Sequence, residues 1–107
     1  MWKRAMIVQP MAGKSEEEIV STRNKAFKFL ESEGYEVVNT LFTDEWYSKE
    51  QMEDRGVINI PLCFIAKSLE NMSLCKVAYF CKGWEETRGC KVEHVVAVAY
   101  GLETIYE

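Results

Sequence analysis

Short apolar runs alternate with stretches of helical period along the whole chain. Four runs have the length and composition of strands, and they cover residues 5–9, 35–39, 77–80 and 103–106. Amphipathic helical patterns lie between them. Because apolar strands that alternate with amphipathic helices are typical of a parallel sheet covered on both faces, the sequence predicts an α/β fold.

The first helical pattern begins with a capping box, in which Ser15 is followed three residues later by Glu18. The acidic first turn complements the helix dipole, and Gly34 supplies the usual stop. Apolar residues recur at helical spacing between these ends: Ile19, Val20, Ala26, Phe27 and Leu30. The opening third therefore predicts a β-α-β unit with a right-handed crossover.

Residues 40–59 form a long connection in which aromatic and acidic residues are mixed. A connection of about twenty residues is uncommon inside a compact domain unless it is a lid, a contact surface or partly helical. Ser48 to Gln51 could cap a short helix that ends near Gly56. Two interpretations remain open: Phe42, Trp46 and Tyr47 pack back on the core, or the segment is a lid or a subunit contact.

Two more helices complete the pattern. Asn59 is expected to cap the third, with Pro61 in its first turn and one apolar face made of Leu62, Ile65, Ala66, Leu69 and Met72. The fourth ends at Gly101 and repeats Val92, Val95, Val96 and Ala99 at helical spacing. We predict a single three-layer Rossmann- or flavodoxin-like domain over residues 1–107, with a four-stranded parallel sheet in the order 2-1-3-4.

That strand order places a switch point between the first and third strands, where ligands of such sheets bind. The loops at this edge are Gln9 to Gly13 and Cys81 to Arg88. A turn followed by a helix entrance leaves unpaired backbone N–H groups and a partial positive charge, which favour an anionic ligand. The sequence therefore predicts a site between these two loops.

Glu93 lies one turn inside that helix entrance, and its neighbours at helical spacing are mostly small. Its carboxylate could therefore face the crevice. The helix N-terminus and nearby Arg88 are expected to favour the charged form, which suits a nucleophile. The alternative is that Glu93 pairs with Arg88 or Lys91 on a solvated helix face.

Composition and charge restrict the function. The net charge of −4 argues against general nucleic-acid binding, while small anionic ligands remain possible. The four cysteines show no C-x-x-C pair and no zinc signature, so reduced, mostly buried thiols and no metal or cofactor are expected. No run is long enough for a membrane span or signal peptide, which predicts a cytoplasmic protein without a membrane partner.

Several residues near the two loops are candidate ligands. Arg88, Lys14 and the amides after Gly83 and Gly89 could bind a phosphate, although both cations could equally be ordinary surface charges. Trp84 could stack on a base or cap the edge of the core. His94, the single histidine, is expected to be structural.

Four motifs together carry a family resemblance: Met-Ile-Val-Gln-Pro-Met-Ala-Gly at 6–13, Gly-Tyr-Glu-Val-Val-Asn at 34–39, Gly-Trp-Glu-Glu-Thr-Arg-Gly-Cys-Lys-Val-Glu-His at 83–94, and Ala-Tyr-Gly at 99–101. Over essentially the whole chain they resemble a small uncharacterised domain family common in phages and Firmicutes. That family is similar to the nucleoside 2-deoxyribosyltransferases and nucleotide N-glycosidases. The similarity to the enzymes rests on the fold, the first loop and one glutamate.

In those enzymes a glutamate four residues after a glycine attacks the anomeric carbon, and Gly89 and Glu93 have that spacing. The resemblance thus implies that Glu93 is the nucleophile. It also implies that the first loop holds the sugar or its phosphate through Gln9, Pro10, Met11 and Gly13. The residues around the second loop that would complete the substrate site are Gly83, Trp84, Arg88 and Gly89.

The enzymes also use aspartates at two positions where this chain has Ser68 and Lys76. An alcohol cannot handle the proton of the leaving base. Glu85 or Glu86 could replace the missing acid. Asp44 and Glu45 are alternatives if the long connection covers the site or reaches a neighbouring subunit.

Three hypotheses follow: an enzyme that cleaves or transfers an N-ribosyl group of a nucleoside or nucleotide, a nucleotide-binding module that senses or sequesters its ligand, and an interaction domain with a vestigial crevice. A homodimer or higher homo-oligomer is expected by resemblance. The aromatic-rich residues 41–47 are a plausible contact surface.

Overall fold

The computed structural model describes residues 3–38 and 45–107. The elements follow one another as β1 (Arg4–Val8), α1 (Glu16–Ser32), β2 (Glu36–Val37), the 3-10 helix η1 (Glu45–Tyr47), α2 (Lys49–Asp54), α3 (Ile60–Met72), β3 (Val77–Phe80), the 3-10 helix η2 (Trp84–Glu86), α4 (Arg88–Ala99) and β4 (Glu103–Tyr106).

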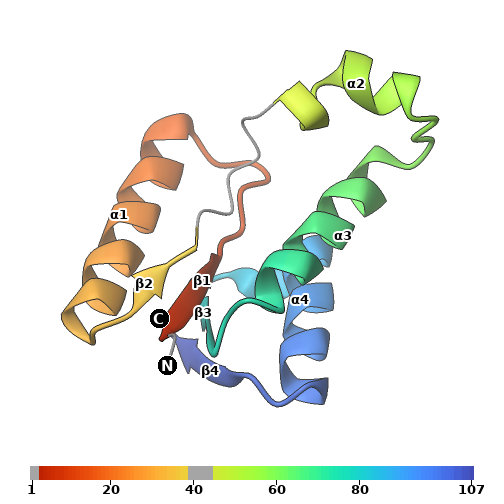
Figure 1. Ribbon diagram of the computed structural model, residues 1–107. Helices are drawn as coiled ribbons and strands as arrows, with labels where there is room; N and C mark the ends of the chain where they lie inside the picture. Colours follow the sequence, from red (N-terminus) through yellow and green to blue (C-terminus); the bar gives the residue numbers. More distant parts are fainter. Residues whose placement is uncertain (1–2, 39–44) are drawn as a thin grey trace.

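The four strands form one parallel sheet in the order β2-β1-β3-β4. This confirms the predicted α/β class and strand order. In Figure 1, α1 covers one face of the sheet, and α3 and α4 cover the other. Ala5 pairs with Val77 and Val8 with Phe80, so β1 and β3 end side by side. Their carboxyl ends therefore open onto the same edge, which is the predicted switch point.

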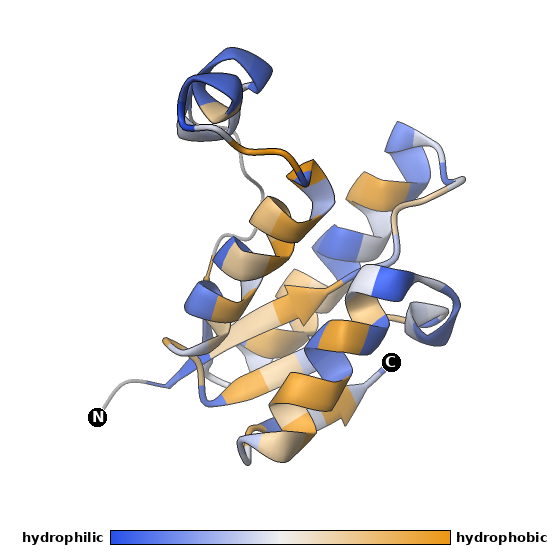
Figure 2. Ribbon diagram, turned by 90° about the vertical axis from the view of Figure 1, so that its right-hand side faces the viewer, coloured by the Kyte–Doolittle hydropathy of each residue, from blue (hydrophilic) through white to orange (hydrophobic). Residues whose placement is uncertain are grey.

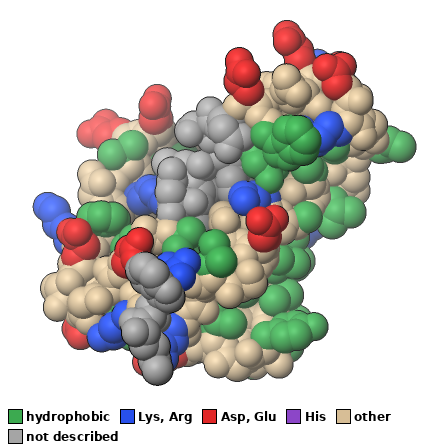
Figure 3. Space-filling view, viewed as in Figure 1, with side chains coloured by type: hydrophobic (Ala, Val, Ile, Leu, Met, Phe, Trp, Pro, Cys, Tyr) green, Lys and Arg blue, Asp and Glu red, His purple; other side chains and the backbone are tan. Residues whose placement is uncertain are grey.

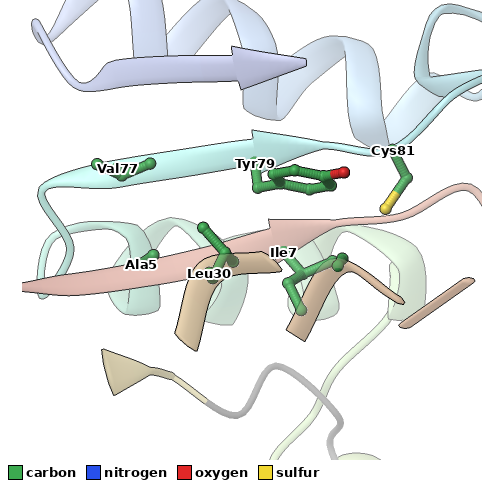
Figure 4. Close-up of a cluster of buried hydrophobic side chains, with 7 residues drawn as sticks. Ala5, Ile7, Leu30, Val77, Tyr79 and Cys81 are labelled. Carbon is green, nitrogen blue, oxygen red and sulfur yellow. The ribbon is translucent and has the colours of Figure 1, made fainter. Parts of the chain in front are cut away.

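The two central strands are buried on both faces, so their side chains alternate between two hydrophobic clusters. The cluster under α1, which Figure 4 shows, contains Ala5, Ile7, Ala26, Leu30, Val77, Tyr79 and Cys81. The cluster under α3 and α4 contains Met6, Val8, Met72, Ala78, Phe80, Cys90 and Ala97. The sheet is thus held between two thin apolar layers.

The predicted helix ends are confirmed. The side-chain oxygens of Ser15, Ser48 and Asn59 accept hydrogen bonds from backbone N–H groups at the starts of α1, α2 and α3, with N···O distances of 3.1–3.2 Å. Gly34 and Gly101 adopt the left-handed conformation that ends a helix. The second strand is shorter than predicted, because only Glu36–Val37 pairs with β1. The last residue of the predicted run, Asn39, lies outside the described residues.

Replacing Ser15 with alanine removes the oxygen that accepts the Glu18 N–H at 3.1 Å. We expect a loss of about 1 kcal/mol of unfolding free energy, measured by urea titration. Ser21→Ala, at an exposed position inside the same helix, is the matched control, and it should leave stability within about 0.5 kcal/mol of the wild type. Equal effects of the two changes would contradict the capping role.

The predicted apolar faces of three helices are partly wrong. Val20 and Phe27 of α1 and Leu62 of α3 are exposed, whereas Ala26, Leu30 and Met72 are buried as expected. The largest difference is in α4, whose Val92 and Val95 are exposed and whose buried residues are Cys90 and Ala97. Val96 packs against the core as expected, whereas Val92 and Val95 face outward. Small residues on the inward side let this helix approach the sheet closely.

The second half of the long connection packs on the start of α3. The Tyr47 ring stacks on Phe64 with centroids 5.8 Å apart, and the guanidinium of Arg55 lies 3.8 Å from the Trp46 ring centroid. Trp46 remains 56% exposed. These aromatic residues therefore do not reach the core under the sheet, and Phe42 lies outside the described residues. In the described part of the chain, no helix has the length and apolarity to cross a membrane.

Candidate functional site

The loops after β1 and β3 meet at the carboxyl edge of the sheet, as predicted. The Cys81 N–H donates to the Val8 carbonyl at 2.9 Å and extends the pairing of the strands. A Cβ at Gly83 would lie 3.7 Å from Cγ of Pro10. Because Gly83 has φ +89°, a conformation costly for other residues, this close turn favours glycine.

Gln9 is the buried polar residue of the first loop, with 8% of its surface exposed. Its side-chain amide donates a 2.7 Å hydrogen bond to the Ile19 carbonyl in α1. Among residues 3–38 and 45–107, no donor reaches its buried Oε1. A buried acceptor without a partner costs stability. The rest of the loop differs, because Pro10 is buried while Met11 and Gly13 are exposed.

The two helix entrances at this edge differ in their suitability for a phosphate. At α1, Ser15 caps the helix and Glu16, Glu17 and Glu18 fill its first turn, which repels an anion. This argues against the phosphate role predicted for Lys14. At α4, the first turn carries Arg88 and Lys91 and no acidic residue, and the side chain of Thr87 makes no capping bond to the described chain. The entrance of α4 is therefore the better anion site.

Most amides after Gly83 are used within the turn itself. The Trp84 N–H donates to Cys81, the Glu86 N–H to Gly83 and the Thr87 N–H to Trp84. The Lys82 N–H donates to a Glu107 carboxylate oxygen at 2.8 Å. The N–H groups of Trp84, Glu86 and Thr87 are therefore not free to bind a phosphate. The first turn of α4 remains as the candidate contact for an anion.

Glu93 is half-buried in the second turn of α4. Its helical position lies between those of Cys90 and Ala97, both buried, so it belongs to the inward side of the helix. Burial raises the pKa of its carboxyl from 4.5 to about 7. The expectation that the helix N-terminus and Arg88 would favour the charged form is therefore wrong. Removing the carboxylate from water outweighs the helix dipole, which falls off beyond the first turn.

The solvated ion pair proposed as the alternative for Glu93 is also absent. In the described part of the chain, the ion pairs are Lys25 with Glu107 and Lys67 with Glu70. Arg88 is exposed and lies about 140° around the helix from Glu93. Glu93 is thus a desolvated carboxyl without a compensating cation among the described residues, an arrangement common at functional sites.

Gly89 and Arg88 lie on a side of α4 that faces the start of α3. A Cβ at Gly89 would lie 3.3 Å from Cδ1 of Ile65, so this glycine lets α4 approach α3. Arg88 and Gly89 line a hollow of about 270 Å³ with Asn59, Pro61, Leu62, Ile65 and Val92. Close packing against α3 is therefore enough to explain the glycine at position 89, four residues before Glu93. Arg88 is turned away from the carboxyl of Glu93.

Trp84 belongs to an aromatic cluster above β3 and β4. Its ring stacks on His94 with centroids 4.1 Å apart and is tilted against Phe80 at 5.4 Å. Nε2 of His94 and the Tyr106 hydroxyl are 2.7 Å apart. His94 thus covers one face of the Trp84 indole, so a nucleobase could stack only on the other face.

A hollow of about 600 Å³ beside this cluster is lined by Phe80, Lys82, Gly83, Trp84, Glu85, Glu86, His94, Tyr106 and Glu107. Both acids considered as replacements for the missing proton carrier, Glu85 and Glu86, lie here and are exposed. His94 shares this side of α4, about 100° around the helix from Glu93. Of the other two candidates, Asp44 lies outside the described residues and Glu45 is exposed in η1.

The helices α3 and α4 run parallel, because their beginnings share one hollow and their ends share another. On α3, Ser68 is half-buried, and helical spacing places it on the inward side with Phe64, Asn71 and Met72. Lys76 is exposed just before β3. Its N–H donates to the Arg4 carbonyl, and its carbonyl accepts from the Glu103 N–H. Ser68 thus occupies an inward position on α3.

Two inward polar residues were not predicted. Arg23 of α1 is half-buried, and burial lowers its pKa although Cys81, at the carboxyl end of β3, is near enough to raise it. Asn71 is buried, and within the described ranges its amide nitrogen lacks a partner. A signal existed for Arg23, because it continues the inward spacing of Ile19, Ala26 and Leu30.

The thiols at this edge are poor nucleophiles. Burial raises the pKa of Cys81 to about 12 and also raises that of Cys90. All four cysteines are free. Over the described residues, no three His, Cys, Asp or Glu side chains gather as a metal site would require. Among the titratable groups on the inward side of α4, Glu93 therefore stands out as the candidate reactive group.

No family model, curated protein or solved structure matches the chain.

Proposed function

We propose that the carboxyl edge of the sheet, where the loops after β1 and β3 meet, binds a nucleotide and that Glu93 cleaves or transfers its sugar by attack on the N-glycosidic carbon. The observation that carries the proposal is the inward position of Glu93 in α4, between buried Cys90 and Ala97, where burial raises the pKa of its carboxyl to about 7. A desolvated carboxyl without an ion pair costs stability, and such costs are concentrated at functional sites.

In this proposal the ionised carboxylate of Glu93 bonds to C1′ and the base leaves with the electrons of the glycosidic bond. Water or a second base then takes the sugar from the resulting ester, and Glu93 is released. With a pKa of about 7, roughly half of the carboxyl groups are ionised at neutral pH. The rate is therefore expected to rise with pH through about 7.

The remaining parts of this edge would bind the substrate. The first loop, in which Met11 and Gly13 are exposed, would hold the sugar. The first turn of α4, with Arg88 and Lys91, would hold a phosphate. Small size and free thiols support a cytoplasmic location as part of the same proposal.

A binding module that senses or sequesters a nucleotide is the second candidate. Ser68 favours it, because this inward position carries an alcohol and offers no proton for the leaving base. Without that proton, a base of high pKa leaves slowly. The two candidates share the ligand and differ in the release of base.

Thermal unfolding with nucleoside 5′-monophosphates, the matching nucleosides and inorganic phosphate tests the shared ligand. We expect the monophosphates to raise the Tm by roughly 10 °C at about 100-fold excess over Kd, and phosphate alone to raise it less. Chromatography of the same mixtures then separates the candidates, because free base accumulates with an enzyme. If no nucleotide shifts the Tm, both candidates fail and an interaction domain remains.

A further inference from the structure

The outward face of α4 carries an apolar stripe. Val92, Val95 and Ala99 follow Arg88 at spacings of four, three and four residues, which place them on one line along the helix. Val95 is 66% exposed and Val92 is 39% exposed. Figure 2 shows the hydrophobic segments of α3 and α4 on the side that faces the viewer, and Figure 3 shows hydrophobic side chains gathered along the right-hand edge.

Neighbouring side chains widen this stripe into a patch. Val98 and Tyr100 flank it on α4, and Tyr100 is 80% exposed. Leu62 of α3 shares a hollow with Val92, and the fully open Ile58 precedes the same helix. Valine is a weak helix former, so exposed valines at three positions of a 12-residue helix bring no benefit unless something covers them.

The charges of α4 favour a particular partner. The first turn contains Arg88 and Lys91 and no acid, and the last turn contains no basic residue. Both ends are therefore poorly matched to the dipole of the helix itself. A second α4 in antiparallel orientation would place the cations of each helix beside the carboxyl end of the other.

We propose that this patch is a two-fold interface between two copies of the chain, in which the α4 helices pack antiparallel. The centre of the stripe lies between Val92 and Val95. Val92 of one copy would therefore contact Val95 of the other copy across the two-fold axis. Ala99 would face Arg88 of the second copy, and its small side chain leaves room for the arginine stem. The seam would extend over about 18 Å, the length of α4.

The apolar part of this interface does not use Glu93, which lies about 100° to 160° around the helix from Val92, Val95 and Ala99. Arg88 belongs both to the interface and to the proposed phosphate contact, so Val95→Glu is the variant that tests the interface alone. This inference also places the contact on α4, whereas the aromatic-rich residues 41–47 were expected from the sequence. Of these, residues 41–44 lie outside the described ranges.

Sedimentation equilibrium over a concentration series tests the interface. We expect the wild type to reach twice the 12.4 kDa chain mass, and Val95→Glu to raise the dimer Kd by at least ~100-fold because it buries an unpaired charge. Val20→Glu, on the outward face of α1 and 50% exposed, is the matched control and should leave the Kd unchanged. Far-UV circular dichroism of each variant confirms that the chain is folded.

A charge reversal tests the antiparallel orientation. Arg88→Glu should also raise the Kd, because it places a carboxylate beside the carboxyl end of the other helix. A wild type that stays at the single-chain mass up to several hundred micromolar would overturn the proposal and favour a different occupant of the patch. So would a dimer that Val95→Glu leaves intact.

Discussion

Glu93→Gln is expected to lower the rate of base release from the best nucleotide substrate by at least ~1,000-fold, while the Kd for that nucleotide changes by less than ~10-fold. The amide has nearly the shape of the carboxyl but cannot form the bond to C1′. Chromatographic rates and calorimetric Kd values, measured on the same preparations, separate the two effects.

Glu31→Gln, at an exposed position in α1, is the matched control for this substitution, and Glu85→Gln tests the other candidate carboxyl. Glu85 is an exposed glutamate in the hollow beside Trp84. We expect Glu85→Gln to change the rate only a few-fold. If Glu85→Gln abolished base release and Glu93→Gln did not, the chemistry would belong to the aromatic hollow and the assignment of Glu93 would be wrong.

The second large effect concerns stability and pH. The pKa of Glu93 is about 7 in the folded chain and 4.5 without burial, so the native state holds the proton more tightly. The wild type therefore loses stability as pH rises from about 4.5 to 7, by up to about 3 kcal/mol, and no further above that range. Glu93→Gln does not titrate. The Tm of Glu93→Gln minus the Tm of the wild type should therefore increase by roughly 10 °C between pH 4 and pH 8.

Differential scanning calorimetry of both proteins at half-unit pH steps measures this difference. Subtracting one curve from the other removes the contributions of the remaining titratable groups, since they are shared. A Tm difference that does not change between pH 4 and pH 8 would mean that the Glu93 carboxyl titrates normally. The raised pKa would then no longer support a functional site at this position.

Much of the fold could be predicted because its signals are local. Ser15, Ser48 and Asn59 each cap a helix through a bond that spans three residues, and Gly34 and Gly101 end helices through their own backbone conformation. Strand order followed from the alternation of elements, since right-handed crossovers leave few topologies. These features depend little on distant parts of the chain.

The orientation of α4 could not be read from periodicity alone. Its valines and its small residues both recur at helical spacing, and the larger apolar side chains suggested the buried face. The structure buries Cys90 and Ala97 instead, because the space between α4 and the sheet is narrow. A hydrophobic period identifies a helix with two distinct faces, and it does not reveal which face a second molecule covers.

The meeting of the two loops was predicted correctly, whereas a site between them stays a prediction. The meeting of the Gln9 and Gly83 loops follows from topology, and the structure brings Pro10 and Gly83 together. The pKa of Glu93 was predicted in the wrong direction, because desolvation depends on elements far apart in sequence. The same holds for Arg23, whose proximity to Cys81 joins α1 to the end of β3.

The central claim is that Glu93 bonds covalently to the sugar, and acid quenching during turnover tests it most directly. Peptide mapping by mass spectrometry after the quench should find the mass of the sugar phosphate on the peptide that contains Glu93, and on no peptide of Glu93→Gln. Base release by the wild type with Glu93 unmodified at every quench time, or with the added mass on another residue, would contradict the account.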